Sequence, residues 1–121
     1  MNGRANRRRG HQAERAVCQY LRTHGWPDAM TTRAKLGHDG ATAPGDISGV
    51  PACIEVKDVA GSSWPTWIAQ ARAEARPGQQ WIVVRRKRGT PDVGKWDAAT
   101  GHNGEGPAFR HDFSEAIGHL S

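Results

Sequence analysis

A run of four apolar residues, Trp81-Ile82-Val83-Val84, is the feature that most constrains how this chain folds. A run of this length without alternating polar residues predicts a strand that is covered on both faces of its sheet. We expect the strand to extend over residues 80–86. A chain of 121 residues forms one domain by length and buries about two-thirds of its unfolded surface. The strand therefore belongs to a single sheet that two or three helices cover.

Hydrophobic periodicity and turn residues predict the other elements. An apolar stripe at helical spacing indicates the first helix, and Ser63 with Pro65 in the first turn begins the second. The expected helices cover residues 10–24, 63–76 and 112–120, and the other expected strands cover residues 28–33, 45–50, 52–58, 95–99 and 108–110, the last two as edge strands. This order predicts the α/β class with a central mixed β-sheet flanked by helices. We expect Gln70 on the surface of the second helix, and the alternative is an amide that supports the site.

The chain is basic, with 17 Lys and Arg residues against 12 Asp and Glu residues and a formal net charge of +5. Two basic clusters stand out, one of Arg4, Arg7, Arg8 and Arg9 and one of Arg85, Arg86, Lys87 and Arg88. A solvated tail and a solvated strand end would explain them, but two such clusters on a small basic domain favour contact with phosphates. We therefore expect a basic N-terminal arm over residues 1–9, a single domain over residues 10–121, and nucleic acid as the partner.

Several classes of protein do not fit this composition. No run of about 18 apolar residues is present, so we expect no membrane-spanning segment. The polar, Arg-rich start is unlike a secretory signal, and two cysteines without such a signal do not make a disulfide framework. Neither the cysteines nor the six histidines have the close spacing of a metal site. The expected location is the cytoplasm.

The strand expected at residues 52–58 carries charged side chains at positions close to the core. Alternation places Cys53, Glu55 and Lys57 on one face and Ile54 and Val56 on the other. A charged pair on a strand that is covered on both faces indicates a functional role. An ion pair between Glu55 and Lys57 within the strand is the simpler alternative.

The preceding strand adds a second acid. A hairpin turn between Val50 and Pro51 would place Asp46 directly opposite Glu55, with about 5 Å between their Cβ atoms. Two facing carboxylates repel each other unless a cation lies between them, and Mg²⁺ prefers such hard oxygen ligands. Lys57 beside this pair could orient or deprotonate a water molecule or stabilise the charge of a phosphate. The two acids therefore predict a site for a hard cation such as Mg²⁺.

This pattern, an acid in one strand followed by a hairpin and Ile54-Glu55-Val56-Lys57, resembles the active-site motif of the PD-(D/E)xK nuclease superfamily. Asp46, Glu55 and Lys57 match its three residues, although the proline precedes Asp46 by two positions and not by one. Residues 9–17 (Arg-Gly-His-Gln-Ala-Glu-Arg-Ala-Val) are similar to the opening helix of archaeal-type and phage Holliday junction resolvases, and Glu14 matches the acid that this helix supplies. The resemblance covers residues 7–97.

The resemblance implies a restriction-endonuclease-like core that cuts branched DNA, namely a four-way junction, with Mg²⁺ or with Mn²⁺ in its place. It implies that Asp46, Glu55 and the Val56 carbonyl hold the metal and that Glu14 is a further acidic ligand. Arg33 and Lys35 would bind the DNA together with the two basic clusters.

Two symmetric nicks by a chain with one site require a homodimer, in the cytoplasm of a bacterium or of a phage-infected host cell. Two alternatives remain open. The first is a repair, flap or restriction-type nuclease on the same fold. The second is a nucleic-acid-binding module without catalysis.

Overall fold

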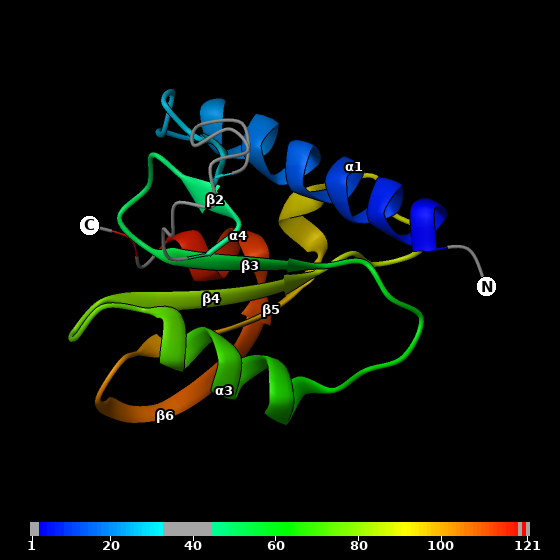
Figure 1. Cartoon of the computed structure of the whole chain (residues 1–121). Helices are drawn as coiled ribbons and strands as arrows, with labels where there is room; N and C mark the ends of the chain where they lie inside the picture. Colours follow the sequence, from blue (N-terminus) through cyan, green and yellow to red (C-terminus); the bar gives the residue numbers. More distant parts are fainter. Residues whose placement is uncertain (1–2, 33–44, 119, 121) are drawn as a thin grey trace.

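A four-stranded sheet in the order β3–β4–β5–β6 forms the centre of the computed structural model, which describes residues 3–32, 45–118 and 120 (Figure 1). The strands are β3 (Cys53–Lys57), β4 (Gln80–Arg85), β5 (Asp97–His102) and β6 (Glu105–Asp112). The β3–β4 pair is parallel, and the other two pairs are antiparallel. The predicted α/β class, with a central mixed sheet flanked by helices, is confirmed.

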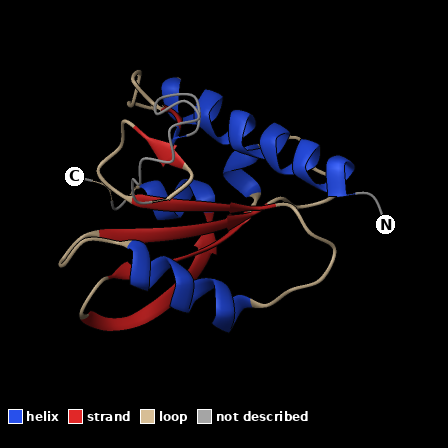
Figure 2. Cartoon of the chain, viewed as in Figure 1, coloured by secondary structure: helices blue, strands red, loops and turns tan. Residues whose placement is uncertain are grey.

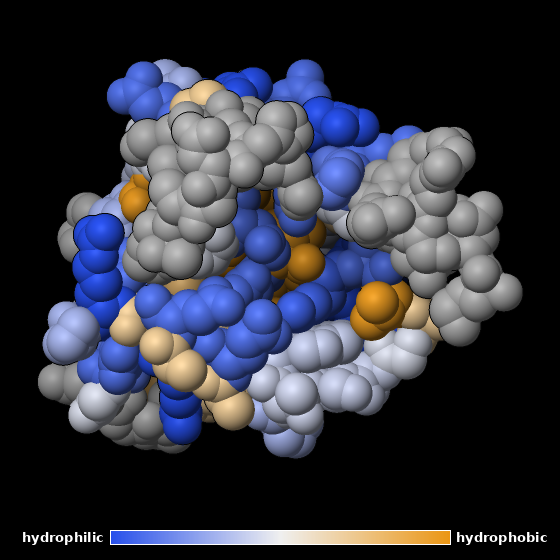
Figure 3. All heavy atoms as spheres, in the orientation of Figure 1, coloured by the Kyte–Doolittle hydropathy of each residue, from blue (hydrophilic) through white to orange (hydrophobic). Residues whose placement is uncertain are grey.

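Helices cover both faces of the sheet (Figures 1 and 2). The helices α1 (Gly3–Arg22) and α4 (Phe113–Ile117) lie on one face, and α3 (Trp64–Glu74) lies on the other. Figure 3 shows one side of the molecule, where hydrophilic residues occupy most of the coloured surface and hydrophobic areas are small and separate. The apolar residues are therefore concentrated between the layers. None of the described helices is both long and apolar enough to cross a lipid bilayer.

The strand β4 divides the core into two parts, as its continuous apolar run predicts. Ile82 and Val84 pack with the residues of α1 and α4, whereas Trp81 and Val83 pack with those of α3. All four side chains are completely buried. Alternation along a strand sends neighbouring side chains to opposite faces, so an apolar residue is needed at every position when both faces are covered.

The first helix begins earlier than the sequence analysis predicts. It extends from Gly3 to Arg22, so the part of the expected arm that the structure describes continues the helix. Arg and Ala are good helix formers, and no proline interrupts residues 3–22. The helix also ends before His24, which is exposed, and Gly25 follows with a φ of 112°. The predicted apolar stripe, which consists of Ala13, Ala16, Val17, Tyr20, Leu21 and His24, is confirmed except at His24. Ala13, Val17 and Leu21 are fully buried, and Ala16 and Tyr20 are partly buried.

The predicted hairpin between residues 45–50 and 52–58 is wrong. The strand β2 (Ile47–Ser48) pairs with β1 (Met30–Thr31) in a separate antiparallel sheet, and β3 pairs with β4. Gly49 explains this path, because a Cβ atom there would lie 2.2 Å from the backbone oxygen of Asp28. The backbone directly after β2 therefore packs against the backbone of the segment before β1. The predicted loop at residues 34–44 lies outside the described residues.

The last third of the chain forms more sheet than its sequence indicates. The strands β5 and β6 are longer than predicted, and β5 is an interior strand, not an edge strand. Its buried positions include Ala98 and Ala99, and alanine has a low strand propensity, so the sequence signal is weak. A short 3₁₀ helix, η1 (Val93–Lys95), precedes β5 and was not predicted.

The predicted start of the last helix is confirmed, although this helix ends at Ile117 and not near Leu120. A capping box begins it. The Asp112 side chain accepts a hydrogen bond from the Glu115 amide at 2.9 Å, and the Asp112 amide donates to the Glu115 side chain at 3.4 Å.

A buried polar network joins the sheet to α4. Gln80 Nε2 donates to Thr100 Oγ1 at 2.8 Å and to the Ala116 carbonyl at 3.3 Å. Thr100 Oγ1 in turn donates to the Trp81 carbonyl at 2.8 Å. Gln80 and Thr100 are both buried, so neither can exchange its partner for water at low cost.

We predict that Thr100→Val lowers the free energy of unfolding by about 1–3 kcal/mol, because it leaves the buried Gln80 amide and Trp81 carbonyl each without this partner. Urea unfolding followed by Trp fluorescence measures the change. The same substitution at Thr66, which is exposed on α3, is the control and should change stability by less than about 0.5 kcal/mol. Equal effects at the two positions would contradict the importance of the network.

Candidate active site

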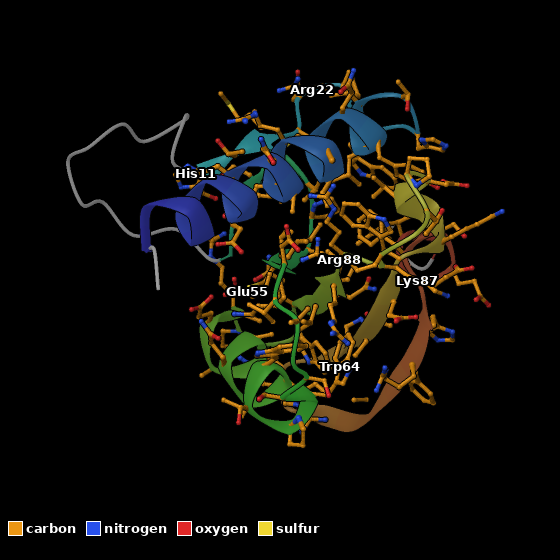
Figure 4. The ribbon with its side chains drawn as sticks, turned by 90° about the vertical axis from the view of Figure 1, so that its right-hand side faces the viewer. His11, Arg22, Glu55, Trp64, Lys87 and Arg88 are labelled. Carbon is orange, nitrogen blue, oxygen red and sulfur yellow. The ribbon has the colours of Figure 1, made fainter. Side chains whose placement is uncertain are left out.

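The strand β3 carries two charged side chains on the face that α3 covers. Cys53, which lies on the same strand face as Glu55 and Lys57, packs with the α3 residues. Ile54 and Val56, on the opposite face, pack with those of α1. The predicted alternation along this strand is therefore confirmed. Glu55 is only 4% exposed, and Lys57 is partly exposed at the end of the strand. In Figure 4 Glu55 lies between the ribbons of α1 and α3.

Asp46 lies along the edge of β3 and is held there by backbone hydrogen bonds. Its amide donates to the Ile54 carbonyl at 2.7 Å, and its Oδ2 accepts from the Val56 amide at 2.8 Å. Gly45 permits this approach, because it has a φ of 79° and a Cβ atom there would lie 2.7 Å from the Ile54 oxygen. The predicted register, with Asp46 directly opposite Glu55, is wrong. The carboxylate is instead fixed to the backbone one residue beyond Glu55.

The two acids are nevertheless neighbours, and the structure adds a third. Glu74, in the last turn of α3, and Asp46 both lie close enough to the Glu55 carboxyl group to raise its pKa. Burial raises the pKa of Glu55 to about 10, and the neighbouring Glu74 and the negative charge of Asp46 act in the same direction. A carboxyl group in this position binds a proton unless a cation compensates its charge.

Glu74 was missed by the sequence analysis, although its position contains a signal. It follows the buried residues Trp67 and Ala71 by seven and three positions. At helical spacing these three residues share one side of α3, which is the side that packs on the sheet. An acid at such a position indicates a partner in the facing strand.

Lys57 contacts the same helix one turn earlier. Its Nζ donates to Gln70 Oε1 at 3.2 Å, and Gln70 Nε2 donates to Glu74 Oε1 at 3.4 Å. Gln70 is exposed, as predicted, yet it also joins the lysine to the acidic group. No direct ion pair between Glu55 and Lys57 is needed to explain the placement of either residue.

The donor atoms at this site suit a hard cation. Asp46 and Glu55 offer carboxylate oxygens, and Mg²⁺ is commonly bound by one or two carboxylates together with water and substrate oxygens. In the described part of the chain, no three His, Cys, Asp or Glu side chains are grouped so that they could hold a metal by themselves. The residues therefore fit a two-carboxylate site and not a cage made only of side chains.

The fourth predicted acid, Glu14, is 8% exposed on α1. Its negative charge contributes to the raised pKa of the Cys18 thiol, for which burial is the main cause. The helix α1 packs on the face of β3 opposite to the one that presents Glu55. The contacts described for Glu55 involve Asp46 and Glu74, so the role of Glu14 at the metal stays a prediction.

Three of the four basic residues at 85–88 contact the segment that follows Lys57. Arg85 Nη2 donates to the carbonyls of Val59 and Ala60 at 3.2 and 2.7 Å. Arg86 and Arg88 form ion pairs at 3.3 and 3.4 Å with Asp58, whose side chain is only 1% exposed. These arginines stabilise the exit of β3. Lys87 and Arg88 remain exposed, so DNA binding by this cluster stays a prediction.

The other predicted DNA-binding residues cannot be placed at the site. The structure describes the backbone of α1 at Arg4, Arg7, Arg8 and Arg9 and not their side chains. Arg33 and Lys35 lie outside the described residues. Their contact with DNA stays a prediction.

The raised pKa of Glu55 predicts that the metal-free protein becomes less stable as the pH rises. The folded state keeps a proton that the unfolded state releases above the ordinary pKa of 4.5. The resulting stabilisation is complete below about 4.5 and is lost progressively as the pH rises to about 10. The free energy of unfolding should therefore fall by at most about 1.4 kcal/mol per pH unit between these values.

Urea unfolding in EDTA at pH 6, 7.5 and 9 measures this dependence. Glu55→Gln cannot ionise and should flatten it, whereas Glu115→Gln, an exposed acid outside the site, should leave it unchanged. An equally steep dependence in Glu55→Gln and in the wild type would contradict the assignment to Glu55.

Searches against protein-family models, curated proteins and solved structures find no match to this chain. The functional inference therefore depends on the chemistry of the residues at the site and on the motif that they form.

Proposed function

We propose that the chain is a Mg²⁺-dependent DNA endonuclease of the PD-(D/E)xK type, with a restriction-endonuclease-like core, that acts on Holliday junctions. The observation that carries the proposal is the buried Glu55, which shares one strand face with Lys57 and has the carboxylate of Asp46 as a close neighbour. A protein that only binds nucleic acid gains nothing from a buried acid beside a second acid. A metal-dependent hydrolase requires such a pair.

Asp46, Glu55 and the Val56 carbonyl would hold Mg²⁺ or Mn²⁺, with Glu14 as a further acidic ligand. When bound, the ion lowers the pKa of a water molecule and screens the charge that develops on the phosphate. The hydrogen bond from the Val56 amide to Asp46 Oδ2 fixes this carboxylate and leaves its second oxygen for the ion. Glu55 gives up its proton when the ion compensates its charge, because the raised pKa arises from burial and from neighbouring acids.

Lys57 acts on the substrate. One of its three N–H donors is directed to Gln70, which leaves two donors for the scissile phosphate or the attacking water. A fixed ammonium group beside the phosphate stabilises negative charge as the phosphorus–oxygen bond breaks. The partial exposure of Lys57 at the end of β3 supports this role, because DNA must reach the side chain from solvent.

The basic residues supply affinity for the phosphate backbone. The net charge of +5, the Arg-rich start of α1 and the exposed Lys87 and Arg88 favour a polyanion. Arg33 and Lys35 would contact the strand that is cut. Arg85, Arg86 and Arg88 also bind the segment that directly follows Lys57, so the basic cluster lies next to the proposed site.

Junction resolution requires two nicks in strands that are related by two-fold symmetry. One chain with a single site makes one nick, so we propose that a homodimer performs the reaction. A dimer presents two identical sites to the two continuous strands of the junction. A repair, flap or restriction-type nuclease would use the same chemistry on a different DNA shape.

Asp46→Asn should abolish DNA cleavage and preserve DNA binding. Asparagine keeps an oxygen that accepts the Val56 amide hydrogen bond, so the local fold should survive while the carboxylate charge is lost. Gel assays with a labelled junction in Mg²⁺ measure cleavage, and mobility shifts in Ca²⁺ measure binding. Asp28→Asn, an exposed acid before β1, is the matched control. Cleavage by Asp46→Asn at the wild-type rate would refute the site.

A panel of DNA substrates tests the junction assignment. We expect the protein to cut a four-way junction with paired nicks and to leave a linear duplex, a single strand and a flap intact under the same conditions. The two nicks should appear at symmetric positions, because a two-fold dimer places its sites symmetrically. Sequence-specific cleavage of the linear duplex would refute the junction assignment and favour a restriction-type enzyme.

A further inference from the structure

The helix α3 presents two polar side chains to the charged face of β3. Lys57 donates to Gln70, and Gln70 donates to Glu74. Glu74 is a neighbour of Glu55 and raises its pKa. Two hydrogen bonds therefore connect the lysine to an acid that lies beside the buried Glu55. Neither Gln70 nor Glu74 belongs to the motif that identified the site.

The spacing of the two elements explains the pairing. Residues two apart on a strand are separated by about 6.6 Å, and residues four apart on a helix by about 6 Å. Lys57 and Glu55 are two apart on β3, and Gln70 and Glu74 are four apart on α3. These two spacings are nearly equal. A helix that runs antiparallel to the strand can therefore place Gln70 beside Lys57 and Glu74 beside Glu55.

The direction of these hydrogen bonds is set by chemistry. The Lys57 ammonium only donates hydrogen bonds, so it must meet the carbonyl end of the Gln70 amide. The amide end then points to Glu74, whose oxygen accepts from it. Glu74 therefore adds a second hydrogen bond that favours the orientation of Gln70 in which its oxygen faces Lys57.

The amide also separates the lysine from the acids. A lysine that pairs directly with a carboxylate has its charge compensated and its position shifted toward that carboxylate. Gln70 holds the ammonium group by a neutral oxygen, so its charge stays available to the substrate. Trp67 and Ala71, which are buried on the same helix, fix α3 against the sheet and so fix this distance.

We propose that Gln70 and Glu74 are positioning residues, which hold the Lys57 ammonium at a set place beside the metal-binding acids. The role of Lys57 in cleavage rests on the proposed function, whereas its placement by these residues does not. Gln70 acts directly on the lysine, and Glu74 acts through Gln70.

Three variants test the proposal. Gln70→Ala and Glu74→Ala should each lower kcat for junction cleavage by about 10- to 100-fold and change KM by less than about twofold. Glu74→Gln keeps an oxygen that accepts from Gln70 and should retain kcat within about threefold of the wild type. Gln19→Ala, an exposed residue on α1, is the matched control and should leave kcat unchanged. Wild-type kcat in Gln70→Ala would overturn the proposal.

A second measurement needs no DNA and no metal. The side-chain resonances of Lys57, assigned with Lys57→Arg, report the environment of the ammonium group by NMR. They should shift in Gln70→Ala and Glu74→Ala and stay near the wild-type position in Glu74→Gln. Unchanged resonances in the two alanine variants would overturn the proposal.

The outcomes also separate this inference from the proposed function. If the wild type cuts no DNA, the nuclease assignment fails while the resonances still decide the placement of Lys57. If Glu74→Gln loses cleavage and binds Mn²⁺ more weakly in titrations of the free protein, while Gln70→Ala is active, Glu74 is a metal ligand. That result would overturn its positioning role.

Discussion

The parallel pairing of β3 with β4 is the constraint on which the rest of the structure depends. Parallel neighbours cannot be joined by a tight turn, so the chain must cross over the sheet between them. The crossover here is α3, which packs Trp67 and Ala71 on the face that also carries Glu55 and Lys57. The same connection that permits the pairing therefore brings Gln70 and Glu74 to the charged residues of β3. A hairpin in its place would leave that face of β3 without either residue.

Burying Glu55 among other acids is unfavourable for the free energy of folding when its carboxyl group is charged. Glu55 is buried beside Asp46 and Glu74, and this raises its pKa to about 10. An apolar residue at this position would avoid that cost, because the neighbouring Cys53 and Trp81 already form an apolar layer there. The proposed Mg²⁺ site would give the acids a role, since a bound cation would compensate their charge. Lys57, two residues along the strand, fits the proposed phosphate chemistry.

Two features of the structure could not be predicted from local sequence patterns, for the same physical reason. The predicted hairpin placed Asp46 by counting from the turn, whereas the close packing of Gly45 and Gly49 decides where that segment lies. DNA binding by the basic run at 85–88 stays a prediction, and the structure adds that Arg85 and Arg86 bind the backbone and the buried Asp58 that follow Lys57. In both cases the partner of a residue is distant in the sequence, so local patterns do not identify it.

The sequence by itself determined the buried central strand, the alternation along β3 and the identity of the acid and lysine pair, because these follow from repeats within a few residues. It also determined the capped start of α4, which depends on Asp112 and Glu115 alone. Only the tertiary structure decided which strands pair, where Asp46 binds β3, and that Glu74 joins Glu55. The positions of Asp46 and Glu74 depend on packing between segments that are eight or more residues apart, where steric fit at glycines and the position of a crossover helix outweigh local preference.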